Sequence, residues 1–372
     1  MTDLERILIV GGGIAGLTLA TALHQQGFTA ELVERSPTWQ TTGAGIMLHG
    51  NGVRILRTLG MSADVELAGT NLQNWSFCDQ QGELLCEIDL QALWGDVGPT
   101  IGIARTRLQQ VLLAGAAEVP CRLGTDLTSL AQDEQHVQVG FSDGSSGDYD
   151  LVVGADGLAS TVRRLTLDAA PSGYTGLMVW RSLAPHHQAS MQVLLGEGCV
   201  FGLVPVGEGQ TYGFGIEGSP RFHAPLEGRL ERVRRRFAAF GGLVPAYLAS
   251  LSHDEQLHCT PIEWVDLEQW HCGRVVLIGD AAHAGPPMMA QGGCIAMEDA
   301  WVLAEVLREA GSVESALESY ASRRRPRVDW VQQESRAWAE SYRLPPTNRN
   351  AAVRERGEQV TQDRFRPLIP VP

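Results

Sequence analysis

The hydrophobic and polar positions at the amino terminus predict a β-α-β unit. Residues 6–10 form a short, mostly apolar run that ends in three glycines, Gly11–Gly13, as a buried parallel strand does before a tight turn. Apolar residues then recur at helical spacing up to Gly27, where the expected helix ends. A second apolar run, 30–33, ends in Glu34 and completes the unit.

Two later apolar runs, 151–153 and 275–278, each stop at a glycine and are expected to be further strands of the same buried sheet. Between them the pattern changes. Short β-rich stretches at 191–195, 200–206 and 211–216 are separated by Gly-Glu-Gly turns, which predicts antiparallel hairpins in a second layer. The predicted fold class is therefore α/β with an inserted antiparallel sheet.

The carboxyl-terminal part of the chain is expected to be helical at first. Residues 299–307 and 312–322 have helical patterns, and Pro326 is expected to kink or end the second helix. The residues after about 344 have little core-forming pattern and are expected to be a peripheral tail.

Charge and cysteine usage narrow the class of protein. The 372-residue chain has a formal net charge of −14, which argues against nucleic acid or an anionic membrane as a partner and favours a small-molecule substrate. Its seven dispersed cysteines include no CxxC pair, so we expect reduced thiols and no metal site. The amino terminus shows no signal peptide and no membrane-length apolar run, which predicts a cytoplasmic protein. The pattern leaves monomer and homodimer open.

The glycines after the first strand form a GxGxxG motif at Gly11, Gly13 and Gly16. The first allows a tight turn, the second lets the backbone approach a diphosphate, and the third permits close packing of helix on strand. Glu34 follows at the distance where an acid accepts hydrogen bonds from an unphosphorylated ribose, which indicates FAD or NAD. Neighbouring residues expected to contact the cofactor are Ile14, Ala15 and Arg35. The alternative is a glycine-rich turn beside a surface glutamate.

A second chemical segment runs from Gly279 to His283 and continues to Gln291-Gly292-Gly293. Its Asp280 follows a buried strand, at the sheet edge where open α/β sheets bind ligands. Unpaired amides at the helix start near Gly292 would face an anion such as the N1–C2=O edge of a reduced flavin. His283 could act in acid–base chemistry, although a structural role in the loop is the preferred interpretation.

With the Gly-Ala-Asp-Gly motif that opens residues 154–163, these motifs resemble the group A flavoprotein monooxygenases, typified by para-hydroxybenzoate and salicylate hydroxylases. The resemblance covers residues 5–335. It implies a Rossmann-like FAD-binding domain with an inserted antiparallel β-sheet substrate domain. The expected domains are FAD-binding at 1–72, 99–168 and 263–345, substrate-binding at 73–98 and 169–262, and a tail at 346–372.

The resemblance also implies roles for individual residues. Asp280 would bond the FAD ribitol, Gly292 and Gly293 would border the flavin pyrimidine, and Arg105 would reach the diphosphate and ribitol. Further expected FAD contacts are Asp156, Pro287 and, in the loop Gly43–Ile46 beside the isoalloxazine ring, Gly45 and Ile46. Asp156 has a structural alternative as a turn residue that bonds its own backbone. The sequence departs from the family at Ala290, where glycine is usual. The arginines 323–325 and 327 are interpreted as a solvated helix face.

The implied activity is that of a monooxygenase: NAD(P)H reduces the flavin, O2 forms a C4a-hydroperoxide, and an aromatic or polycyclic substrate is hydroxylated or epoxidised. Such chemistry needs a dry, apolar pocket. The candidate pocket residues are Trp180, Phe201, Leu203, Phe214, Met288 and Met289, and the candidate catalytic residues are Tyr212, Arg181 and His49. Core packing is the alternative for each of the pocket residues on the strands.

Other functions of the same fold stay open. A dehydrogenase would not incorporate oxygen, and a flavin-dependent halogenase would carry a Trp-x-Trp-x-Ile-Pro segment, which this sequence lacks. A non-catalytic FAD- or ligand-binding protein would not oxidise NAD(P)H. The sequence has no second GxGxxG for a nicotinamide cofactor, and no thioredoxin-like domain is expected.

Overall fold

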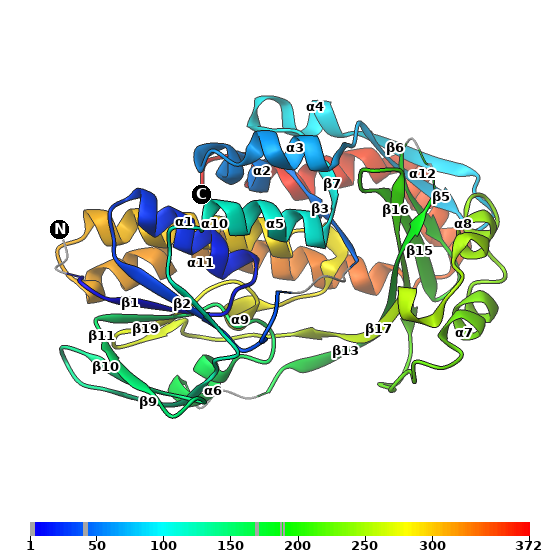
Figure 1. Cartoon of the computed structure of the whole chain (residues 1–372). Coiled ribbons are helices and arrows are strands. Elements are labelled where there is room, and N and C mark those ends of the chain that lie inside the picture. Colours follow the sequence, from blue (N-terminus) through cyan, green and yellow to red (C-terminus); the bar gives the residue numbers. More distant parts are fainter. Residues whose placement is uncertain (1–3, 40–43, 168–170, 187, 189) are drawn as a thin grey trace.

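The computed structural model describes residues 4–39, 44–167, 171–186, 188 and 190–372. Its first layer is a six-stranded sheet built on the predicted β-α-β unit (Figure 1). In order across the sheet, the strands are β18 (His271–Cys272), β19 (Val275–Leu277), β12 (Leu151–Gly154), β1 (Ile7–Val10), β2 (Ala30–Glu34) and β8 (Cys121–Leu123). All neighbouring pairs are parallel except β18 with β19. The prediction that residues 151–153 and 275–278 join one sheet is confirmed.

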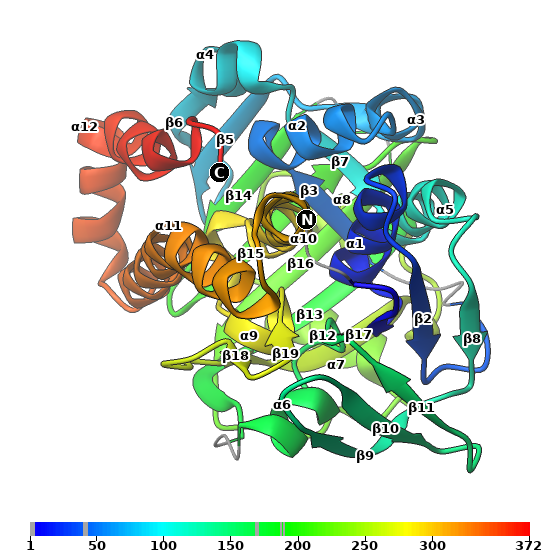
Figure 2. The same ribbon diagram turned by 90° about the vertical axis from the view of Figure 1, so that its left-hand side faces the viewer.

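Helices cover one face of this sheet, and a small sheet covers the other (Figure 2). The helical face consists of α1 (Ile14–Gln25), α5 (Arg105–Gly115), α10 (Gly292–Glu309) and α11 (Val313–Ser341). On the opposite face lie β9 (Leu127–Gln132), β10 (Val137–Phe141), β11 (Ser146–Tyr149) and α6 (Thr161–Thr166). Strands β1 and β12 are buried along their whole length because both faces are covered, which explains their continuous apolar runs.

The second layer is a seven-stranded sheet that contains the predicted hairpins. Its order is β17 (Leu257–Trp264), β13 (Gly173–Pro185), β16 (Gln210–Gly218), β15 (Cys199–Pro205), β14 (Met191–Leu195), β5 (Asn74–Asp79) and β6 (Leu84–Asp89). Neighbours are antiparallel except β14 with β5. One face is covered by α7 (Arg229–Arg236) and α8 (Val244–Ser250), at the right of Figure 1.

A three-stranded sheet joins the two layers. It consists of β3 (Gly45–Leu48), β7 (Ile101–Ala104) and β4 (Thr70–Asn71), and its neighbours are α2 (Gly50–Thr58), α3 (Ser62–Ala68) and α4 (Leu90–Trp94). β3 contacts β16 of the second layer, and α2 packs on α10 of the first. One hydrophobic cluster includes residues of both layers, and the domain bounds expected above stay a prediction.

The carboxyl-terminal region differs from the expectation in two ways. First, α11 does not end at Pro326 but continues to Ser341, because proline removes one hydrogen bond while buried side chains hold the helix on both sides of it. Second, residues 346–372, expected to be a peripheral tail with little core-forming pattern, form α12 (Pro346–Phe365) and a short 3-10 turn. Phe365 at the end of α12 and Leu368 in the 3-10 turn are fully buried. The other residues of α12 are mostly polar, so the sequence pattern did not indicate that this region packs against the core. Within the described residues, no helix has the length and apolarity to cross a membrane.

Candidate functional site

A cavity of about 790 Å³ lies among the first layer, the seven-stranded sheet and α11. One end is lined by the first glycine-rich turn and the end of β2. The middle is lined by residues 284–288 and 290–293 and by Gly45 and Ile46 of β3. The remaining wall is formed by strands of the second layer. The cavity therefore connects both predicted chemical segments to the antiparallel sheet.

The glycine-rich turn has the geometry that a diphosphate requires. Gly11 has a φ of 110°, and a Cβ there would lie 2.5 Å from the carbonyl oxygen of Ala155. A Cβ at Gly16 would lie 1.9 Å from the carbonyl oxygen of Gly11, whereas a Cβ at Gly13 would meet no atom of the described residues within 4 Å. Gly13 faces the cavity together with Ile14 and Ala15 at the start of α1, where the first amides lack helical partners. This end of the cavity fits the diphosphate of FAD.

Glu34 lies at the end of β2 and lines the same part of the cavity. Its carboxylate accepts hydrogen bonds from the amides of Gly12 and Ser36, both at 2.8 Å, so its position beside the turn is fixed. Arg35 is exposed and is not among the lining residues, so the expected contact is not supported. The prediction missed Trp39, whose ring packs over Gly12 and lines the cavity.

The expected flavin end is lined by most of the residues that the resemblance implied. These are Gly45, Ile46, Arg105, Asp280, Pro287, Gly292 and Gly293, with Gln109 beside Arg105. Gly292 begins α10, and the first backbone bond of that helix runs from the Ile295 amide to the Gln291 carbonyl. The amides of Gly292 and Gly293 precede this bond, and both residues line the cavity where a flavin edge would lie. Gly43, also expected at this site, lies outside the described residues.

Ala290 precedes this helix in the left-handed region, with a φ of 50°. A residue with a Cβ is strained in this conformation, whereas glycine adopts it freely. The departure from the family's glycine therefore places strain in the chain next to the expected flavin position.

A buried charge network holds both flavin-facing segments from behind. The Asp299 carboxylate accepts a hydrogen bond from the Gly279 amide at 3.0 Å and contacts the Nε2 of His283 at 2.6 Å. It also accepts a bond from Nε of Arg324 at 2.8 Å. Burial alone would raise the pKa of Asp299, but the charges of His283 and Arg324 lower it to about 2. His283 is thus fixed by Asp299, in agreement with the structural interpretation.

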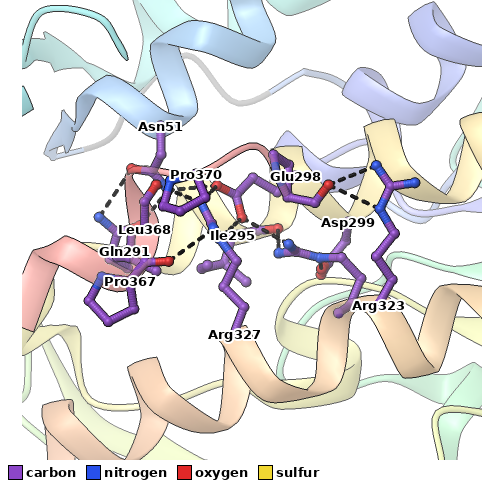
Figure 3. Close-up of polar contacts among 12 residues, drawn as sticks. Asn51, Gln291, Ile295, Glu298, Asp299, Arg323, Arg327, Pro367, Leu368 and Pro370 are labelled. Atoms are coloured by element: carbon purple, nitrogen blue, oxygen red, sulfur yellow. Dashed lines mark hydrogen bonds and ion pairs between the residues drawn. The ribbon is translucent and has the colours of Figure 1, made fainter. Parts of the chain in front are cut away.

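Glu298, beside Asp299 on α10, extends the network to the second segment (Figure 3). It forms ion pairs with Arg324 at 2.9 Å and Arg327 at 2.8 Å, and accepts a hydrogen bond from Asn51. Asn51 in turn donates to the Gln291 side chain at 2.9 Å. Arg327 also donates to the carbonyls of Pro367 and Leu368, so the carboxyl terminus is tied to the same network.

This network corrects the interpretation of the arginine cluster as a solvated face for two of its four members, whereas Arg323 and Arg325 are partly exposed. Arg324 is completely buried and Arg327 is nearly so. Their partners, Glu298 and Asp299, lie on α10, which packs against α11. The residue pattern of one helix cannot show that carboxylates on a neighbouring helix will pair with its arginines. Two buried carboxylates require buried cations, and this requirement places the two arginines inside.

Asp156 is also placed differently from the expectation for a cofactor ligand. Its carboxylate accepts bonds from the amides of Thr161 and Val162 at the start of α6, and it does not line the cavity. The turn-residue alternative is therefore the one that the geometry supports. The segment 154–163 contacts the site through Arg163, which donates a hydrogen bond to the carbonyl of Ala281 at 2.7 Å and so helps to position the segment 279–283.

His49 does not face the cavity, and its candidacy as a catalytic residue is not supported. It is fully buried, and its Nδ1 accepts a hydrogen bond from the indole N–H of Trp94 at 3.2 Å. Burial lowers the pKa of His49 to about 3. A neutral imidazole that is buried away from the cavity cannot exchange a proton with a substrate there.

The pocket candidates on the antiparallel sheet divide according to the face they occupy. Tyr212, Phe214 and Arg181 line the cavity, and Met288 does so from the loop. Met289 is buried outside the lining. Trp180, Phe201 and Leu203 were predicted wrongly, since they belong to the hydrophobic cluster on the opposite face.

The physical reason is the register of the hairpin. Phe201 is paired with Gly215 and Leu203 with Gly213, so both share the face opposite Phe214. The sequence analysis missed lining residues on the other face of the sheet, which include Val204 on β15, Val179 on β13, Met191 and Val193 on β14, and Trp75 on β5. It also missed a wall from α11, formed by Val328, Val331, Gln332 and Ser335. The spacing 328, 331, 332, 335 is that of one helix face and could have revealed the α11 wall.

Comparisons with known proteins agree with this geometry. A family model described as FAD binding domain matches residues 5–214 and 247–335. The chain is 34% identical to aurachin C monooxygenase/isomerase of Stigmatella aurantiaca over 91% of this chain and 88% of that protein. It is 32% identical to an FAD-dependent urate hydroxylase of Klebsiella pneumoniae over 87% and 86% of the two chains.

The fold is similar to a solved structure that contains the cofactor. The crystal structure of Klebsiella pneumoniae HpxO complexed with FAD and uric acid has a TM-score of 0.92 and 27% sequence identity. The similarity covers 100% of this chain and 98% of the other. The resemblance stated from the motifs is thus confirmed, and FAD is the cofactor that the site residues fit.

Proposed function

The chain belongs to the FAD binding domain family, among FAD-dependent monooxygenases and hydroxylases, and from this premise we propose that it uses NAD(P)H and O2 to oxygenate an aromatic or polycyclic small molecule. For a hydroxylation the balance is RH + NAD(P)H + H⁺ + O2 → ROH + NAD(P)⁺ + H2O. The observation that carries the proposal is the continuity of one cavity, which runs from the diphosphate cradle at Gly13 to an apolar chamber beside Gly292.

Bound FAD would supply the redox chemistry, with oxygen transferred from a C4a-hydroperoxide of the reduced flavin. The chain's own residues bind and orient. Arg105 and the free amides at the starts of α1 and α10 hold the anionic parts of the cofactor, and Asp280 lies where the ribitol would pass.

The chamber next to the flavin position excludes water. Its wall includes Phe214, Val204 and Met288, which offer no hydrogen bonds to a water molecule. Arg181 and Tyr212 supply polar contacts to a substrate oxygen in this proposal. Two of the relatives act, by their names, on aurachin C and on urate, and we propose an aromatic ring system as the substrate of this chain too.

The test is isotopic. Purified protein loaded with FAD is supplied with NADH or NADPH and candidate aromatics under ¹⁸O2, and the product mass and released H2O2 are measured. We expect ligand-stimulated NAD(P)H oxidation and one ¹⁸O atom per product molecule. Oxidised product without ¹⁸O would indicate a dehydrogenase, a product halogenated in the presence of halide would indicate a halogenase, and FAD binding without NAD(P)H oxidation would indicate a binding protein. Each of these results overturns the proposal.

A further inference from the structure

The floor of the cavity crosses six neighbouring strands of the seven-stranded sheet. In sheet order, the lining residues include Ile262 on β17, Val179 and Arg181 on β13, Phe214 and Ile216 on β16, Val204 on β15, Met191 and Val193 on β14, and Trp75 on β5. Strands in a sheet are about 4.8 Å apart, so five spacings correspond to roughly 24 Å. We call this floor the groove. It is several times longer than a single aromatic ring.

The groove is polar at one side and apolar at the other. On β13, Arg181 donates a hydrogen bond of 2.7 Å to the hydroxyl of Thr260 on β17, and both side chains line the cavity. On β15, β14 and β5, the described lining residues are Val204, Met191, Val193 and Trp75, with no charged group among them. Along the floor of the groove, a ligand would therefore meet a cation on β13 and only valine, methionine and tryptophan side chains on β15, β14 and β5.

Strand register shows that the apolar side is continuous. Val204 is paired with Tyr212, and Met191 is paired with Trp75, so these residues form one row across four strands. In the next row, Gly202 lies between Phe214 and Val193. A Cβ at Gly202 would lie 2.1 Å from the ring of Phe214, so the missing side chain allows that ring to lie over β15 as part of the floor.

The apolar side has a roof and an end wall. Val328, Val331, Ser335 and Tyr342, from α11 and the residue after it, face the sheet across the cavity. The ring of Trp75 stacks on that of Trp338 with centroids 5.6 Å apart and contacts Phe77 at 5.0 Å. These rings close the far end, so the groove holds a tail of limited length.

We propose that the substrate is an elongated amphiphile: an oxygenated aromatic head held near Arg181 and the flavin, with a hydrocarbon tail that lies over β15 and β14 towards Trp75. This inference rests on the proposed function, which it deepens by naming the substrate class. A compact polar ring would leave the apolar row uncovered, whereas a tail would bury it. Each methylene buried against such a wall strengthens binding roughly fourfold.

The test separates binding from oxygenation. The FAD-loaded protein is titrated with 5-alkylresorcinols of one, three, five, seven and eleven carbons, and with 2-alkyl-4-hydroxyquinolines of the same lengths. Binding is read from the flavin absorbance, and product from ¹⁸O incorporation. We expect the Kd to fall roughly threefold to fourfold per methylene for both heads, then to level off when the tail reaches Trp75.

A Kd independent of tail length, or tighter binding of the shortest homologues, overturns the inference even if they are oxygenated. Binding of the long homologues without ¹⁸O incorporation overturns the proposed function instead.

Two variants place the tail. Val193→Thr keeps the shape of the wall but adds a hydroxyl, and should weaken the longest homologues about fivefold while leaving the one-carbon homologues unchanged. Val193→Phe should fill the groove and shorten the tail at which the Kd levels off. Phe201→Leu, on the opposite face of the neighbouring strand, is the matched control and should leave the dependence on tail length unaltered. Equal effects of the Val193 and Phe201 variants on long and short homologues would contradict the placement.

Discussion

The two ends of the cofactor cavity are built by different means. At the diphosphate end, the consecutive residues 7–16, from β1 to the first turn of α1, supply the turn, the open position at Gly13 and the first amides of α1. At the flavin end, the segments at 279–283 and 291–293 are held by Asp299 and Glu298 of α10, by Arg324 and Arg327 of α11, and by Asn51 of α2. The first site is made of backbone, and the second depends on charges brought together from distant parts of the chain.

The difference concerns where each site is vulnerable. A diphosphate site made of backbone is disrupted when a side-chain methyl occupies the space that a glycine leaves open. A buried charge network contributes to the stability of the whole fold, since removal of one partner leaves the other charges desolvated and unpaired. We therefore expect substitutions in the charge network at the flavin end to lower both stability and FAD binding. At the diphosphate end, a methyl at the cavity-facing Gly13 should lower FAD binding alone, whereas one at the packed Gly16 should lower stability.

Acid is expected to have the largest effect, through His49 beside the flavin end. The unfolded chain accepts a proton on this histidine near pH 6.5, whereas the folded protein does so only near pH 3. Its contribution to the unfolding free energy is therefore complete above pH 6.5 and is lost as the pH falls to 3, by about 5 kcal/mol. Asp299, whose pKa is lowered, adds to the loss only below about pH 4. Urea unfolding from pH 7 to 4 measures this slope.

The control for this prediction is a pair of histidine variants. His49→Gln keeps an acceptor for the Trp94 N–H but does not titrate, so its unfolding free energy should depend less on pH than that of the natural protein. His24→Gln, at an exposed position on α1, should keep the full slope. An undiminished slope in His49→Gln would refute the assignment.

Arg324→Met is expected to cost about 3–5 kcal/mol of unfolding free energy, because it leaves Glu298 and Asp299 buried without their shared cation. It should also weaken FAD binding, since Asp299 holds the Gly279 turn. Arg308→Met, which alters an exposed arginine at the end of α10, should cost less than 1 kcal/mol. Denaturant unfolding and flavin fluorescence titration measure both quantities. Equal costs in the two variants would show that the network is not what holds the flavin end.

Alanine at two glycines of the same motif should give opposite results. Gly16→Ala places a methyl 1.9 Å from the Gly11 carbonyl and should destabilise the protein without FAD by about 2–3 kcal/mol. In Gly13→Ala the new methyl contacts none of the residues that the structure describes, so the stability without FAD should change by less than about 1 kcal/mol. Its methyl would enter the diphosphate position and should raise the Kd for FAD at least tenfold. If Gly13→Ala binds FAD normally, the diphosphate does not lie there.

The smallest effect concerns the strained alanine. Ala290→Gly should stabilise the protein by about 0.5–1 kcal/mol, because relief of the left-handed conformation exceeds the added entropy of the unfolded chain. Ala284→Gly, at a φ of −48°, has no strain to relieve and should be destabilising. Thermal unfolding of both variants decides the sign, and a loss of stability in Ala290→Gly would exclude strain at this position.

The sequence by itself determined the local features of this protein. The strands of the first layer, the three roles of the GxGxxG glycines and the hairpins at 191–216 follow from patterns within a few residues, where chain connectivity enforces proximity. The resemblance of the motifs added the positions of Asp280, Arg105 and Gly292 along the cavity.

Only the tertiary structure decided the rest. Whether Phe201 faces substrate or core depends on which side of the sheet α7 and α8 cover, and alternation along a strand leaves both sides equivalent. Arg324 is buried rather than solvated because of carboxylates on another helix, and the polar α12 is fixed by Phe365 alone among its large apolar side chains. In each case the deciding free energy comes from a partner distant in the chain, which a local pattern cannot contain.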